Sequence, residues 1–261
     1  GQKVQFTNIT TIDPVRPILS QNYPSYGSNV FSDVMRADAQ IKELNDYEKM
    51  EGDQLPGLMI VAMPNDHTAG TRPEVPTPRA MVADNDYALG KIVEDFSRSR
   101  FWENTVIFVV EDDSQSGWDH VSAYRTVALV LSPYSRLRKT VHTYYTQPAM
   151  VRTIEQILGM PPMNIQDAIA PPMVNCFTHT MDKTPYTAIP NNIPLDEMNP
   201  PLKSLSGKAK YFAEQSMLPE FDGIDKGNDD LLNRILWFAA RGNEKYPAWY
   251  AGTGNKDEDD D

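Results

Sequence analysis

The spacing of apolar residues along the chain predicts four helices. In each stretch, apolar side chains recur every three or four positions among polar ones, which gathers them on one face of a helix. Thr77 is expected to cap the start of the second helix, with Pro78 in its first turn. Gly159 is followed closely by two prolines and is expected to end the third helix. We expect these helices over residues 29–50, 77–102, 147–159 and 228–241.

Three short apolar runs predict buried strands. Residues 58–63, 105–110 and 126–131 carry no charge, and a proline or an acidic residue follows each run within two positions. Strands buried on both faces are typical of parallel sheets that lie between layers of helices. Because helices and strands also alternate along the chain, the sequence predicts an α/β fold, a three-layer sandwich with a mostly parallel central sheet.

Outside these elements the composition changes. Residues 1–28 lack periodicity and are expected to form an irregular leading segment before a core domain over residues 29–163. Prolines crowd together after residue 160, so residues 164–254 are expected to be an irregular extension that ends in the last helix. The final residues, 255–261, are mostly acidic and are expected to be a disordered tail.

Charge and cysteine usage exclude several kinds of partner and bond. The net charge of −12 leaves no surplus of Lys and Arg to neutralise the phosphates of nucleic acid or an anionic membrane. No apolar run approaches the roughly 20 residues that a membrane span requires. Cys176 is the only cysteine, which excludes an internal disulfide, and we expect it to lie in the core.

Two polar clusters follow predicted strands and are candidates for chemistry. One is residues 64–70, with Asp66 and His67; the other begins at Glu111 and continues through Asp112 and Asp113. Three adjacent carboxylates repel one another unless a cation lies among them, and a divalent metal is the usual cation. Because neighbouring residues point to opposite sides of a strand, at most two can reach one ion, and the last two are the better candidates.

Histidines strengthen the case for a site. His67, His120 and His142 all lie just past predicted strands or in the loops that follow them. Imidazole at such positions can bind a metal, donate a hydrogen bond to a phosphoryl oxygen or act as a general acid. Taken alone, either cluster also fits a local turn or a cap of the next helix. Together they indicate a functional site.

Several motifs in the middle of the chain resemble those of one known family. The motifs are "LPGLMIVAMPNDHTAG" (55–70), "MVADNDYALGKIVEDFSRSRFWENTVIFVVEDD" (81–113), "DHVSAYRTVALVLSPY" (119–134) and "VHTYYTQPAMVRTIEQILGMPPM" (141–163). They resemble, in order, motifs of the phosphoesterase branch of the alkaline phosphatase-like superfamily, which includes phospholipase C-type and acid phosphatase-type enzymes. The resemblance covers a little under half of the chain.

The resemblance implies metal-dependent hydrolysis of a small phosphate ester. By this likeness the metal ligands are Asp66, Asp112, Asp113 and His142. The phosphate is bound by Asn65 and His67, and the catalytic residues are His67 and His120. The ion would polarise the phosphoryl group while a serine or threonine accepts it. Zinc or manganese is expected, with calcium as the alternative; histidines suit ions softer than calcium.

The sequence departs from the family in one respect. An earlier Glu-Asn ligand pair and the Ser or Thr nucleophile have no counterpart here, so the sandwich is expected to be incomplete on its N-terminal side. The chain is then the second half of a larger enzyme, with little activity alone, whose partner is the missing N-terminal half of the same protein. Related bacterial surface proteins carry a β-propeller before this domain, which implies a secreted, periplasmic or cell-surface location.

One function of a different class remains open. A non-catalytic cell-surface binding module that kept a degenerate phosphoesterase fold would show the same motifs, because fold alone does not determine function. A structural protein with calcium-binding acidic loops is a third interpretation, which the histidine-containing turns disfavour.

Overall fold

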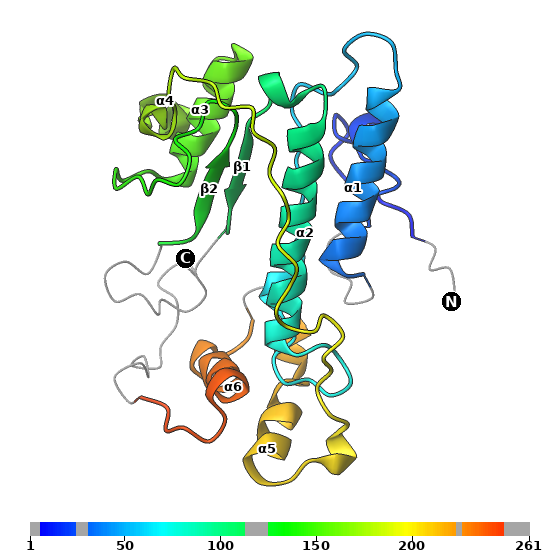
Figure 1. The fold of residues 1–261 in the computed structure, drawn as a ribbon. Coiled ribbons are helices and arrows are strands. Elements are labelled where there is room, and N and C mark those ends of the chain that lie inside the picture. The colour runs from blue at the N-terminus through cyan, green and yellow to red at the C-terminus, as the bar shows by residue number, and fades with distance from the viewer. Residues whose placement is uncertain (1–5, 25–30, 113–124, 223–225, 248–261) are drawn as a thin grey trace.

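Helices make up most of the regular secondary structure (Figure 1). The computed structural model describes residues 6–24, 31–112, 125–222 and 226–247. The predicted acidic tail, 255–261, lies outside them. The helices are α1 (Asp33–Glu48), α2 (Pro78–Arg98), α3 (Gln147–Leu158), α4 (Ile165–Ile169), α5 (Gly207–Gln215) and α6 (Asp229–Arg241), and the strands are β1 (Ile107–Val110) and β2 (Ala128–Leu131). Short 3-10 turns include η2 (Pro64–His67) and η5 (Val174–Cys176).

The predicted helices are confirmed, and their ends have the expected caps. The Thr77 side chain accepts a hydrogen bond from the Ala80 amide at the start of α2. Thr146 caps α3 and Asn228 caps α6 in the same way. Gly159 ends α3 in the left-handed conformation that glycine adopts most readily. Side-chain caps and helical periodicity are local signals, so the sequence locates these helices without knowledge of the fold.

Helices α1 and α2 pack side by side and form the larger core (Figure 1). Ala37 and Ala88 are fully buried, and such small side chains let the two helix backbones approach closely. Larger apolar residues from both helices and from the turn after α2 surround them. The buried cluster consists of Ala37, Leu44, Ala88, Ile92, Phe96, Phe101 and Trp102.

The predicted mostly parallel sheet is wrong. In the described residues β1 and β2 form a two-stranded antiparallel sheet, with Ile107 opposite Leu131 and Val110 opposite Ala128. The apolar run 58–63 is not a strand, and Ile60 is 90% exposed. An uncharged apolar run indicates an extended, buried chain but contains no information on its direction or on which strand lies beside it.

Helices nevertheless cover both faces of this small sheet. Successive residues of a strand point to opposite faces, so Ile107 packs against the α1–α2 cluster and Phe108 against a second cluster on α3. The second cluster consists of Ala149, Met150, Met173 and Cys176. The expectation that Cys176 lies in the core is confirmed. The predicted three-layer sandwich is therefore also wrong, because the sheet has only two strands.

The segment after α4 returns along α2 toward its N-terminus (Figure 1). The Tyr186 amide donates to the Ser97 hydroxyl at 2.9 Å, and the Ala188 amide donates to Glu94 at 3.0 Å. Farther on, the Asn199 side chain donates to the carbonyl of Gly70 at 3.1 Å. The region expected to be irregular thus follows a defined path, and it includes α4 and α5. None of the described helices is long and apolar enough to cross a membrane.

Candidate functional site

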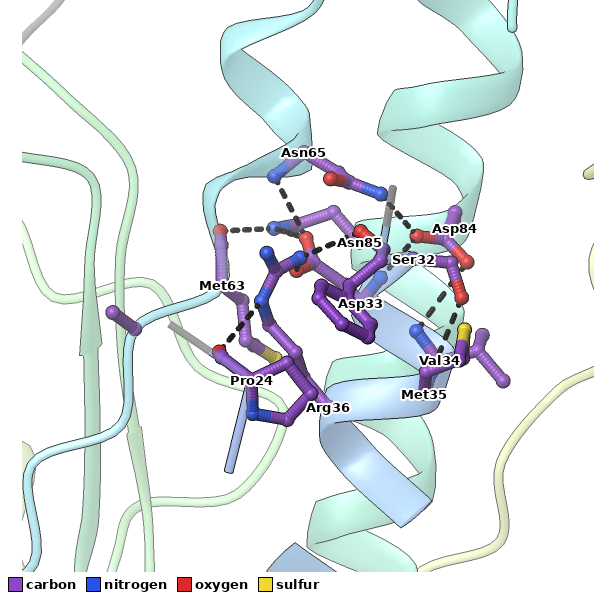
Figure 2. A network of polar contacts seen from close by, with 12 residues as sticks. Pro24, Ser32, Asp33, Val34, Met35, Arg36, Met63, Asn65, Asp84 and Asn85 are labelled. Carbon is purple, nitrogen blue, oxygen red and sulfur yellow. Dashed lines mark hydrogen bonds and ion pairs between the residues drawn. The ribbon is translucent and has the colours of Figure 1, made fainter. Parts of the chain in front are cut away.

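A buried polar network lies where α1 begins (Figure 2). Asp84 belongs to α2, yet its carboxylate accepts hydrogen bonds from the amides of Asp33 at 2.6 Å and Val34 at 3.3 Å, in the first turn of α1. The first amides of a helix lack partners within the helix, and a negative charge there is favourable. Asp84 therefore caps a neighbouring helix and fixes how α1 and α2 meet.

Asp33 and Arg36 form an ion pair inside this network. The Arg36 Nη1 lies 2.9 Å from Asp33 Oδ1 and also donates to the Phe31 carbonyl at 2.9 Å, and both side chains are fully buried. Burial raises the pKa of Asp33, although hydrogen bonds and the Arg36 charge act in the opposite direction. A buried carboxylate needs such partners to remain ionised.

The turn η2 is attached to this network by two asparagines (Figure 2). The Asn65 amide donates to Asp33 at 2.8 Å and its side chain donates to Asp84 at 2.6 Å. Asn85 donates to the Met63 carbonyl at 2.7 Å, to Asp33 at 3.1 Å and to Asp66 at 3.5 Å. The position of Asp66 is thus set by side chains from α1 and α2.

Asp66 lies at the edge of the network, where its carboxylate accepts a hydrogen bond from Asn85. Its carboxyl is half-buried, and its pKa is raised first by this burial and then by the negative charges of Glu111 and Asp33. Glu111 directly follows β1, where its amide donates to the Val127 carbonyl at 3.1 Å and its carboxylate accepts from the Thr126 hydroxyl at 3.0 Å. The charge of Glu111 thus acts on Asp66 although the two residues are far apart in sequence, and a like charge of this kind favours binding of a proton or a cation.

The other predicted site residues lie apart from this pair or outside the described chain. Asp112 is exposed, and its carbonyl accepts a hydrogen bond from Gln147 at the start of α3. His67 is exposed with its ring Nδ1 3.4 Å from the Thr68 carbonyl. His142 is exposed in a groove lined also by Arg136 and Lys139, and cationic neighbours favour an anion over a metal ion. Asp113 and His120 lie outside the described residues.

In the described part of the chain, no three His, Cys, Asp or Glu side chains are grouped so that they could hold a metal ion. Asp66, Asp112 and His142 therefore do not form a three-ligand set. Sequence reasoning also missed Glu111 as the neighbour of Asp66, and it missed Asp33 and Asp84. A signal for Asp84 was present, because this charged residue occupies a position on the buried face of α2.

We expect Asp66→Asn to raise the stability of the protein at pH 7. The raised pKa means that the folded protein binds more protons than the unfolded chain between the ordinary and the raised pKa. The free energy of unfolding therefore falls as pH increases through this window, and the loss persists at neutral pH. The neutral amide of asparagine removes this loss of stability. The gain in the free energy of unfolding should stay below about 1 kcal/mol, because the half-exposed group is screened by solvent.

Urea unfolding at pH 7 measures this gain, with Asp46→Asn as the control. The pKa of Asp46 is lowered by hydrogen bonds from Lys42 and Lys49, so its neutralisation should reduce stability. Equal changes in the free energy of unfolding of the two variants would contradict the repulsion of the Asp66 carboxylate by neighbouring negative charges.

Comparisons of the chain with protein-family models, with curated protein sequences and with solved structures found no match.

Proposed function

We propose that this chain provides part of the metal and phosphate site of a phosphoesterase whose nucleophile is supplied by another segment of the same secreted or surface protein. The observation that carries the proposal is the half-buried Asp66, whose pKa is raised by burial and by the negative charge of Glu111. In the described residues neither carboxylate forms an ion pair with Lys, Arg or His. Two such carboxylates gain most from a divalent cation placed between them.

The donor atoms near Asp66 are compatible with a divalent metal. Asp66 and Glu111 supply carboxylate oxygens, which suit manganese or calcium better than zinc. Such an ion would polarise a phosphoryl oxygen. Asn85 donates hydrogen bonds to both Asp66 and the buried Asp33, and an outer partner of this kind orients a metal ligand.

Titration with manganese or zinc, followed by calorimetry, tests the metal part of the proposal. Asp66→Asn should weaken binding at least about tenfold, because it removes a ligand. Asp46→Asn is the matched control, since this carboxylate lies on the exposed side of α1 and is already paired with lysines. Equal affinities in all three proteins would show that the ion does not bind at Asp66.

Hydrolysis tests the catalytic part. The full-length protein and this chain should be assayed on an aryl phosphate and an aryl phosphodiester, with and without zinc, manganese or calcium, each beside its Asp66→Asn variant. Metal-dependent activity of the full-length protein, reduced at least about tenfold in the variant, is the expected result. A folded, metal-saturated full-length protein without activity would favour the non-catalytic binding module.

A further inference from the structure

An open groove of about 760 Å³ lies between the loop that joins β2 to α3 and the segment that follows α4. One wall is formed by residues 135–143 and the other by residues 175–182. None of the lining residues belongs to the Asp66–Glu111 pair or to the buried polar network.

Backbone hydrogen bonds hold the two walls in place. The Arg136 amide donates to the Cys176 carbonyl at 2.9 Å, and the Thr178 amide donates to the Tyr134 carbonyl at 2.8 Å. The Asn175 side chain adds a bond to the Thr143 hydroxyl at 2.9 Å. Beneath the walls, Cys176 belongs to the core cluster on α3. The groove is therefore formed before any ligand arrives, which reduces the entropy lost on binding.

The groove is cationic in an acidic protein. Between Asp119 and Glu155 the sequence contains no acidic residue but five arginines and lysines, while the whole chain has a net charge of −12. Two of the five, Arg136 and Lys139, line the groove together with His142. In the described part of the chain neither Arg136 nor Lys139 has an ion-pair partner. A positively charged region on an otherwise negatively charged protein attracts anions to that region.

The groove also contains hydrogen-bonding groups that suit an oxyanion. The Arg136 Nε donates to the Phe177 carbonyl at 3.0 Å, which fixes the plane of the guanidinium. Asp182 is the acidic residue of the lining; its carboxylate accepts a hydrogen bond from the Thr184 amide at 2.9 Å and keeps its negative charge, so that it offsets one of the two cations, Arg136 and Lys139. Hydroxyl groups complete the lining; they belong to Ser135, Thr140, Thr143, Thr178 and Thr180.

We propose that this groove binds a phosphate group, free or esterified, with Arg136 and Lys139 neutralising its charge and threonine hydroxyls donating to its oxygens. A guanidinium pairs with phosphate through two parallel hydrogen bonds, and a lysine adds a point charge. The inference goes beyond the proposed function and does not depend on it, because binding here requires neither a metal ion nor hydrolysis.

Calorimetry on the full chain in low-salt buffer without metal tests the inference, with inorganic phosphate and glycerol 3-phosphate as the two probes. Lys139→Gln should weaken binding of the preferred probe about fivefold, the effect of one partly screened charge. The side chain is exposed, so the variant should fold normally. Tighter binding of glycerol 3-phosphate would assign the groove to a phosphate ester, and tighter binding of inorganic phosphate would assign it to the free ion.

Lys208→Gln is the control, since this lysine is exposed on α5 and does not line the groove. If both variants weaken binding equally, the attraction is general and the inference is overturned. It is equally overturned if neither probe binds the native chain, or if Lys139→Gln binds as tightly as the native chain. No outcome of this experiment involves hydrolysis or a metal, so a negative result does not bear on the proposed function. A negative result in the metal or hydrolysis experiments does not bear on phosphate binding in the groove.

Discussion

Replacing Arg36 with methionine is expected to lower the free energy of unfolding by about 3–5 kcal/mol, as does removal of one partner from a buried ion pair. The fully buried Asp33 would lose the cation that lies 2.9 Å from its carboxylate. Methionine retains most of the apolar length of the side chain, so the loss reports the unpaired charge more than a cavity. Urea unfolding followed by circular dichroism measures the change.

Two further variants make this result specific. Lys42→Met, on the exposed side of the same helix, removes a solvent-exposed pair with Asp46 and should change stability by less than about 1 kcal/mol. Adding Asp33→Asn to Arg36→Met should recover part of the loss, because the amide oxygen still accepts hydrogen bonds without a charge. A loss below about 1 kcal/mol in Arg36→Met would show that this ion pair does not hold the start of α1.

The second large effect is expected at Gly70, where Gly70→Ala should lower stability by about 2–4 kcal/mol. Gly70 has a φ of +57°, which disfavours any residue with a Cβ atom. The added Cβ would lie 2.8 Å from the Cγ2 of Ile235 and 3.0 Å from the hydroxyl oxygen of Ser216. Ile235 is only 1% exposed, and Ser216 already accepts a hydrogen bond from the Thr71 amide, so neither can move freely.

Gly159→Ala separates the effect of the positive φ from the effect of the steric contact. Gly159 has a similar φ of +68°, but no atom lies within 4 Å of the position of an added Cβ. It should therefore cost only about 1 kcal/mol, the backbone contribution alone. The difference between the variants, from thermal unfolding of each, measures the contact of the turn at Gly70 with α5 and α6. Equal losses would mean that these helices do not pack against the turn.

The helices could be predicted from the sequence because their signals lie within a few residues of each other. Thr77, Thr146 and Asn228 each act as a cap at the position where the sequence places one. The sheet could not be predicted in the same way. The runs 58–63 and 105–110 look alike as sequence, yet only the second becomes a strand, because strand formation depends on which chain lies alongside.

The sequence singled out some residues of the candidate site, because polar and acidic clusters are local patterns. The acidic run does follow the strand β1, but the run 58–63 before Asp66 is not a strand, so the rule that ligands bind beyond strand ends does not apply to Asp66. The sequence does not show that the charge of Glu111 acts on Asp66, because that depends on how η2 is held against α1 and α2. Asp33 and Asp84 reach the network only through contacts between helices, and no local pattern reports such contacts.

The exposed run 58–63 has a consequence for the behaviour of the chain in solution. It combines high β-propensity with no charge, and in the described structure no strand covers its backbone hydrogen-bonding groups. Such segments act as templates for intermolecular strand pairing and aggregation. Pro56 and Pro64 flank the run and lack the amide hydrogen needed to extend a ladder. We expect these prolines to act as gatekeepers that limit strand pairing between chains to the few residues between them.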